Sequence, residues 1–263
     1  MTPSAHNPRR LHGVHNVIAV GSGKGGVGKS TTALQLALSL QRKGYNVGLL
    51  DLDIFGPSLP TLLNLHEKPV MKTDPKAIIP FTIHGIKAMS IGFMVDPDQA
   101  IIWRGLMVTQ MINQLFELTV WCDPLPLDYL IVDLPPGTGD VVLTLIQKIN
   151  LLGAIVVSTP QDLALMDAQR AINMFQKTKT PLLGIIENMS SLTCPHCHTD
   201  IDIYGKGRIQ NEARRLDIPY LGDVPLEIDI RRACDAGTPL IIQHKGFYDV
   251  ITQNLLTQIK TIT

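Results

Sequence analysis

A glycine-rich segment near the N-terminus carries the residue types best suited to chemistry. Residues 23–30 fit the pattern G-x-x-x-x-G-K-[ST] and lie between an apolar run and an amphipathic stretch. Glycines let backbone N–H groups converge on phosphate oxygens, and the N-terminus of a following helix adds a favourable dipole. The segment therefore predicts a phosphate loop for a nucleoside triphosphate, which we take to be ATP. The predicted nucleotide-binding residues are Gly23, Lys24, Gly25, Gly26, Val27, Gly28, Lys29, Ser30 and Thr31.

Other polar side chains could complete this site with magnesium. Lys29 should reach the β and γ phosphates, and the Ser30 hydroxyl should bind Mg²⁺, which needs few protein ligands. Asp51 and Asp53 follow one apolar run and Asp133 follows another, and open parallel sheets bind ligands at such strand ends. We expect Asp133 to hold magnesium through a water molecule. Strand-end aspartates also cap helices, but a neighbouring phosphate loop favours the magnesium role.

A close pair of cysteines is the second informative feature. Cys194 and Cys197 are separated by two residues, and thiolates at this spacing can bind one metal or cluster from a single turn. Two ligands are too few, so a second chain related by a two-fold axis would supply two more around one [4Fe–4S] cluster. Zinc remains an alternative, because it also suits four thiolates, and His196 or His198 could complete a mixed site in one chain.

The rest of the chain alternates short apolar runs with stretches of helical period, which predicts an α/β fold. Such βαβ units build a mainly parallel P-loop NTPase sheet with helices on both faces. Strands are expected at residues 17–20, 47–50, 78–83, 86–91, 129–132, 154–157 and 182–186. Helices are expected at residues 29–43, 107–118, 141–149, 163–177, 207–216 and 248–260. The runs at 78–91 should form a hairpin, and residues 64–77 should form a mobile loop.

Length and composition favour one globular domain. The chain has 263 residues, of which 45% are hydrophobic, so residues 17–263 should form a single ATPase domain behind a flexible N-terminus, residues 1–16. Lys plus Arg equals Asp plus Glu at 23 each, which gives no reason to expect a nucleic acid or a membrane as partner. No apolar run approaches the ~18 residues of a membrane span, and no secretory signal is evident, so we expect a cytoplasmic protein.

Lys24 indicates which class of phosphate loop this segment resembles. It stands directly after the first glycine, and in this the segment resembles the deviant Walker A motif of the MinD/ParA/nitrogenase-iron-protein class. The resemblance implies that Lys24 contacts phosphates bound by the partner subunit of an ATP-sandwich dimer. It further implies that Lys24 assists Lys29 in catalysis and that ATP hydrolysis, a slow reaction in this class, is coupled to dimerisation.

Five motifs together resemble the Mrp/ApbC family of iron–sulfur cluster carrier ATPases. They are Trp103-Arg104-Gly105, residues 133–140, Thr159-Pro160-Gln161-Asp162, Glu187-Asn188-Met189-Ser190 and Cys194-Pro195-His196-Cys197. The resemblance implies a homodimer that holds a [4Fe–4S] cluster between subunits, in a segment near residues 190–205, and passes it to apo-proteins. It also implies that Asp53 orients the attacking water, that Asp51 and Asp133 serve the magnesium shell, and that Asn188 contacts the adenine. Leu106 departs from the family pattern, which has proline there.

Two other functions fit parts of this pattern. A positioning ATPase of the MinD/ParA kind would share the nucleotide site, but it predicts a basic amphipathic helix, and the C-terminal stretch has few lysines. A zinc-bridged dimeric nucleotide switch would use the same cysteines with a different metal. Client proteins are expected only for the cluster carrier.

Overall fold

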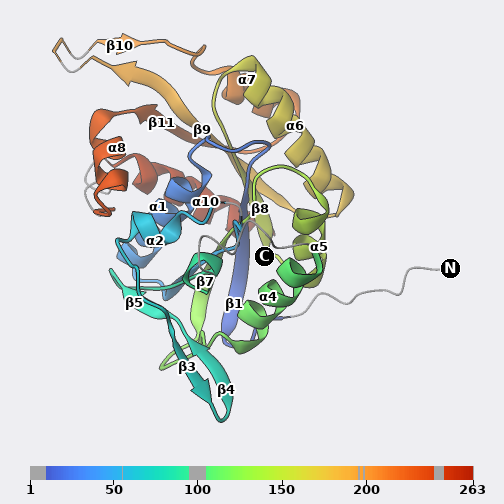
Figure 1. Ribbon diagram of the computed structural model, residues 1–263. Helices are drawn as coiled ribbons and strands as arrows, with labels where there is room; N and C mark the ends of the chain where they lie inside the picture. Colours follow the sequence, from blue (N-terminus) through green and yellow to red (C-terminus); the bar gives the residue numbers. More distant parts are fainter. Residues whose placement is uncertain are drawn as a thin grey trace.

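A sheet of nine strands forms the centre of the computed structural model, which describes residues 10–54, 56–94, 105–194, 196–197, 199–239 and 246–262 (Figure 1). Its strands are β1 (Val14–Gly21), β2 (Val47–Asp51), β5 (Phe81–Ile83), β6 (Ile86–Ser90), β7 (Leu127–Asp133), β8 (Gly153–Ser158), β9 (Leu182–Thr193), β10 (Asp200–Ile201) and β11 (Tyr220–Leu226). The strand order is β10-β9-β8-β1-β7-β2-β6-β5, with β11 also paired to β9. Parallel pairs join β11, β9, β8, β1, β7, β2 and β6. The expected mainly parallel sheet is confirmed.

Helices cover both faces of this sheet, as the apolar character of its strands requires. Every residue of β2 and β8 is buried. One face packs against α4 (Gly105–Leu118), α5 (Asp140–Lys148), α6 (Asp162–Lys177) and α7 (Arg208–Arg215). The other packs against α1 (Lys29–Arg42), α2 (Leu59–Leu62), α8 (Ile228–Asp235) and α10 (Phe247–Ile262). None of the helices described is long and apolar enough to cross a bilayer.

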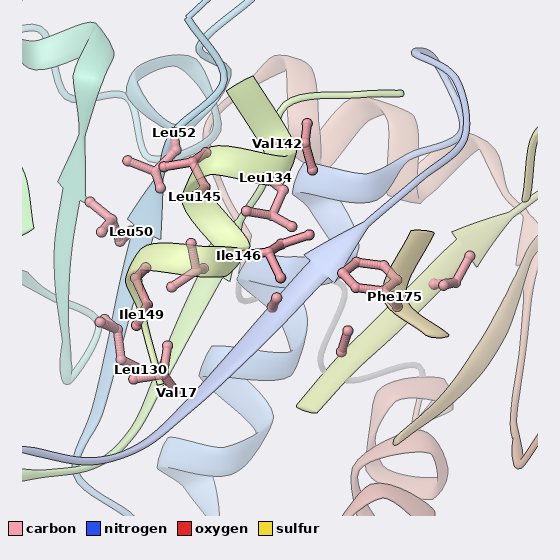
Figure 2. Close-up of a cluster of buried hydrophobic side chains, with 14 of the residues drawn as sticks. Val17, Leu50, Leu52, Leu130, Leu134, Val142, Leu145, Ile146, Ile149 and Phe175 are labelled. Carbon is pink, nitrogen blue, oxygen red and sulfur yellow. The ribbon is translucent and has the colours of Figure 1, made fainter. Parts of the chain in front are cut away.

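Helix α5 shows how sequence period produces this packing. Val142, Leu145, Ile146 and Ile149 recur at helical spacing and lie buried against side chains of β1, β2 and β7 (Figure 2). Phe175 of α6 closes the cluster at one side. Because α5 directly follows the loop after Asp133, this packing fixes the position of that loop at the carboxyl end of the central strand β7.

The segment expected to be a loop is partly a hairpin instead. Strands β3 (Val70–Thr73) and β4 (Lys76–Ile79) pair antiparallel as a separate two-stranded sheet, and the hairpin extends away from the domain (Figure 1). The loop prediction for 64–77 is therefore wrong over residues 70–77. Every residue of β3 is exposed, so the strand lacks the buried alternation by which strands are usually identified.

The predicted hairpin at 78–91 is confirmed only in its second part. Strands β5 and β6 pair antiparallel around His84 and Gly85, whose φ angles of 51° and 79° lie in the left-handed region. Residues 78–79 belong to β4, and residues 91–93 form a 3₁₀ turn, η1 (Ile91–Phe93). The break at Pro80, which cannot donate a hydrogen bond to a ladder, separates the two hairpins.

Candidate functional site

The phosphate loop joins the end of β1 to the start of α1. Gly26 and Gly28 have φ angles of 78° and 81°, which side chains with a Cβ rarely adopt. A Cβ at Gly25 or Gly26 would meet no atom within 4 Å, so the backbone there is open to a bound group. Gly28 precedes the first residue of α1, and the helix N-terminus therefore faces the loop. This arrangement fits an anion at the helix start.

Packing also requires glycine at positions 23 and 28. A Cβ at Gly23 would lie 2.0 Å from the main-chain carbonyl of Asp167 in α6. A Cβ at Gly28 would lie 2.1 Å from the side-chain nitrogen of Asn188, which donates a hydrogen bond of 2.8 Å to the carbonyl of Val27. The loop is thus held against α6 on one side and β9 on the other. Asn188 lies at the loop, and its contact with adenine stays a prediction.

Lys29 forms the electrostatic centre of the site. Its side chain is only 6% exposed, and its Nζ lies 2.5 Å from Asp133 and 3.9 Å from Asp53. The Ser30 hydroxyl lies 3.3 Å from the same Nζ. Burial raises the pKa of Asp133, while the positive charge of Lys29 opposes that shift. The structure therefore brings together Lys29, Ser30, Asp53 and Asp133 from three segments, as the sequence predicts.

The second oxygen of Asp133 is where magnesium would fit. Asp133 Oδ2 is buried and has no hydrogen-bond partner among the residues described, and such an atom is costly unless a bound group satisfies it. The hydroxyl of Ser30 also lies close enough to lower the pKa of Asp133. Oxygen donors of this kind suit hydrated Mg²⁺. Ser30 and Asp133 are thus the residues that would hold the ion beside the phosphates.

Asp51 has a different surrounding from Asp133. Its oxygens accept hydrogen bonds from the main-chain N–H groups of Asp53 and Leu59 and from the hydroxyl of Ser90. Burial, followed by the charge of Asp133, raises the pKa of Asp51 to about 7. Through these hydrogen bonds Asp51 stabilises the turn that carries Asp53. Its place in the magnesium shell stays a prediction.

Lys24 points toward the start of α6. Its Nζ lies 3.4 Å from the side-chain oxygen of Gln161, the residue that precedes the first residue of this helix. The side chain is half-buried and is not paired with Asp53 or Asp133 among the contacts of the residues described. Lys24 is therefore available to a phosphate other than the one Lys29 would bind, and its action across a dimer stays a prediction.

The cysteine pair lies directly beyond the end of β9. The main-chain N–H of Cys194 donates to the carbonyl of Thr199 at 3.0 Å, which closes a tight turn around Cys197. Cys197 is exposed and Cys194 is half-buried. Pro195 and His198 lie outside the described residues. Among the residues described, no third His, Cys, Asp or Glu joins the pair in a metal-binding group, so the described part of one chain offers two thiolates.

The Cys197 thiol should be unusually reactive in the metal-free protein. Its hydrogen bonds to Thr199, first the hydroxyl at 3.3 Å, lower the pKa of Cys197 to about 7. We expect iodoacetamide to alkylate Cys197 at neutral pH faster than Cys234, whose pKa is raised by burial. Peptide mass spectrometry of a pH series should give a midpoint near 7 for Cys197, and Thr199→Val should move that midpoint upward. A midpoint unchanged by Thr199→Val would contradict this explanation.

Sequence reasoning assigned no role to three residues that the structure places at the site. Gln161 contacts Lys24, Ser90 supports Asp51, and Thr199 supports the cysteine turn. Gln161 stands within one of the family motifs, so its motif was the available signal. Ser90 belongs to no motif, and only the fold brings it near Asp51. Thr199 stands two residues after Cys197, and this closeness in the sequence was the available signal. Trp103 and Arg104 lie outside the described residues.

The fold and the phosphate loop define a P-loop NTPase of the MinD/ParA class. The cell division ATPase MinD of Pyrococcus furiosus matches with a TM-score of 0.67 at 18% identity, over 92% of this chain and 98% of that one, which shows the shared fold. A nucleotide-binding protein of Archaeoglobus fulgidus, solved in complex with ADP, matches with a TM-score of 0.76 at 36% identity, over 90% of this chain and 91% of that one.

The chain belongs to the ParA family of NUBPL iron-transfer P-loop NTPases, whose family model matches residues 13–261. An iron–sulfur cluster transfer protein NUBPL of Dictyostelium discoideum is 45% identical over 96% of this chain and 79% of its own length. An iron–sulfur cluster carrier protein of Salmonella typhimurium is 47% identical over 90% of this chain. The match spans 63% of the length of that relative. The resemblance to cluster carriers is thereby confirmed at the level of family.

Proposed function

We propose that this protein is an ATPase that carries a [4Fe–4S] cluster and transfers it to apo-proteins. The observation that carries the proposal is the cysteine turn, in which Cys194 and Cys197 present two thiolates at the protein surface. Half a coordination set on an exposed turn suits a cluster that is shared and then released. The relatives named as cluster carriers and transfer proteins support the same function.

ATP hydrolysis is the second part of the proposal. Lys29 would bind the β and γ phosphates, Ser30 and Asp133 would hold Mg²⁺, and Asp53 would orient the attacking water. Asp53 lies 3.9 Å from Lys29, which supports a role of its carboxylate beside the expected γ-phosphate. Such a site acts mainly by positioning the nucleophile and by stabilising charge on the transferred group.

The proposed active unit is a homodimer. Two copies would supply four thiolates to one cluster, and Lys24 of each would reach the nucleotide of the other. Lys24→Ala should therefore leave ATP binding by the monomer within about threefold of the original, while hydrolysis falls by roughly 10³-fold, as expected for a cation acting in trans. Analytical ultracentrifugation with a non-hydrolysable ATP analogue should show the wild type as a dimer and the variant as a monomer. Equal dimerisation by both proteins would contradict the role of Lys24.

A zinc-bridged nucleotide switch is the alternative that the cysteine geometry leaves in place, because zinc accepts the same four thiolates. A MinD-like positioning function is less favoured, since Ile251, Leu255 and Ile259, at helical spacing in α10, are buried in the core. We accordingly propose no membrane or nucleic-acid partner.

The proposed cytoplasmic location stays a prediction, and one relative, from Arabidopsis thaliana at 43% identity, is named as a mitochondrial protein.

Anaerobic reconstitution with iron and sulfide tests the proposed cargo. We expect about four irons and four acid-labile sulfides per dimer, with visible absorption typical of a cluster. The loaded protein should then activate an apo form of a [4Fe–4S] enzyme with a known assay. Tight zinc binding without iron or sulfide uptake would support the zinc switch instead, and binding of neither would contradict the carrier function.

A further inference from the structure

Strand β9 connects the phosphate loop with the cysteine turn. It lies between β8 and the edge strand β11, where Glu187 pairs with Ser158 of β8 and Asp223 of β11, and it ends one residue before Cys194. Strands buried on both sides are among the least deformable parts of a fold. We therefore expect a shift at Glu187 and Asn188, in the middle of β9, to reach the end of the strand beside Cys194.

Two neighbouring residues of β9 form hydrogen bonds that connect the strand to the two sites. Asn188 donates a hydrogen bond of 2.8 Å to the carbonyl of Val27 in the phosphate loop. Glu187 accepts a hydrogen bond of 2.8 Å from the main-chain N–H of Gly207. Because adjacent side chains of a strand point to opposite faces, Asn188 contacts the phosphate loop on one side of β9 and Glu187 contacts Gly207 on the other.

Gly207 is the far end of the cysteine segment, which we define as residues 194–207. The Asp202 carboxylate accepts bonds from the main-chain N–H groups of Gly205 and Lys206 and holds the turn that leads to Gly207. Gly207 then precedes α7, with a φ angle of 85°. Both ends of the cysteine segment are thus tied to β9, one by the chain itself and the other by Glu187.

The hydrogen bond between the Glu187 carboxylate and the N–H of Gly207 should be a strong one. The residue is fully buried, with 0% exposure, and a carboxylate that accepts from the N-terminus of a helix makes a charge-assisted bond. Burial raises the pKa of Glu187, while the N–H groups of Gly207 and Gln210 oppose the shift. Nothing in the proposed ATPase chemistry uses this carboxylate.

We propose that Glu187 is a positioning residue that couples nucleotide binding to metal binding at the cysteine pair. The inference rests on the proposed function, since it assigns Glu187 the connection between the two sites. Displacement of Asn188 by a nucleotide would move β9, and Glu187 would pass that movement to the far end of the cysteine segment. Coupling of this kind is reciprocal, so metal should change nucleotide affinity by the same factor.

Zn²⁺ titration of the metal-free protein, with and without a non-hydrolysable ATP analogue and Mg²⁺, measures the coupling. We expect a factor of about 5 or more in the wild type, within the usual range for coupled sites. Glu187→Ala should bring the factor close to 1, while each ligand alone binds within about threefold of its wild-type affinity. Glu187→Gln keeps an oxygen that can accept from Gly207 and should retain most of the coupling.

Two further variants complete the test, one that perturbs Gly207 and one that serves as a control. Gly207→Ala strains the left-handed backbone without a clash, since a Cβ there meets nothing within 4 Å, and it should reduce coupling even where Glu187→Ala does not fold. Ser190→Ala removes the bond from β9 to Asp223 and should leave coupling intact.

The outcomes separate the inference from the proposed function. Coupling that persists in both Glu187→Ala and Gly207→Ala, or a wild type that binds both ligands without coupling, would overturn the inference alone. A wild type that binds no Zn²⁺ at Cys194 and Cys197 would overturn the proposed cysteine site as well.

Discussion

Lys29→Met should abolish ATP hydrolysis, with kcat lowered at least about 100-fold, the usual effect of removing one group that stabilises developing charge. Methionine keeps the apolar stem of the buried side chain but has no amine. That amine pairs with Asp133 at 2.5 Å, and we expect it to contact ATP instead when ATP binds, which frees Asp133 for hydrated Mg²⁺. Phosphate release under saturating ATP measures the effect, and binding of a fluorescent ATP analogue measures the accompanying loss of affinity.

The matched control is Lys43→Ala, which removes an exposed lysine from the other end of the same helix. It should hydrolyse ATP at the wild-type rate. Removing one partner of a buried ion pair can cost about 3–5 kcal/mol of stability, so thermal unfolding of Lys29→Met must be compared with that of the wild type. A folded Lys29→Met protein with wild-type phosphate release would show that the ATPase site lies elsewhere.

The central sheet could be predicted because its strands and helices have strong, simple patterns. Strands such as β2 and β8 are buried throughout and therefore appear as unbroken apolar runs. The exposed strand β3 and the edge strand β11, which contains Gly222, Asp223 and Pro225, lack that pattern. β3 forms a hairpin with β4 outside the core, whereas the position of β11 depends on pairing with the distant strand β9, which the local sequence does not specify.

The nucleotide site could be predicted because its residues form a contiguous motif and follow strand ends. The separate role of Asp51 could not, because Asp51 and Asp133 both follow apolar runs in the sequence. Only the fold gives Asp51 three hydrogen-bond donors and leaves an oxygen of Asp133 without a partner in the described part of the chain. The link from Glu187 to Gly207 likewise spans 20 residues and has no local signal.

Replacing both cysteines of the turn should eliminate the cargo and leave the ATPase domain intact. Cys194→Ala/Cys197→Ala removes all four thiolates that a dimer would place around one cluster, so iron and sulfide should fall from about four each per dimer to background after anaerobic reconstitution. The turn lies beyond the end of β9, and Cys197 is exposed, which leaves the core unchanged and predicts a thermal unfolding temperature close to that of the wild type.

The remaining cysteines provide the control for that variant. Cys122 contacts His12 and Cys234 contacts Thr31, and neither belongs to a group of metal ligands among the residues described. Cys122→Ala/Cys234→Ala should therefore load the same iron and sulfide as the wild type. Full loading of the Cys194→Ala/Cys197→Ala protein would contradict the shared site, whereas loss of loading in both double variants would point to a general effect of thiol content. The cargo is assigned to the turn only if the two double variants differ.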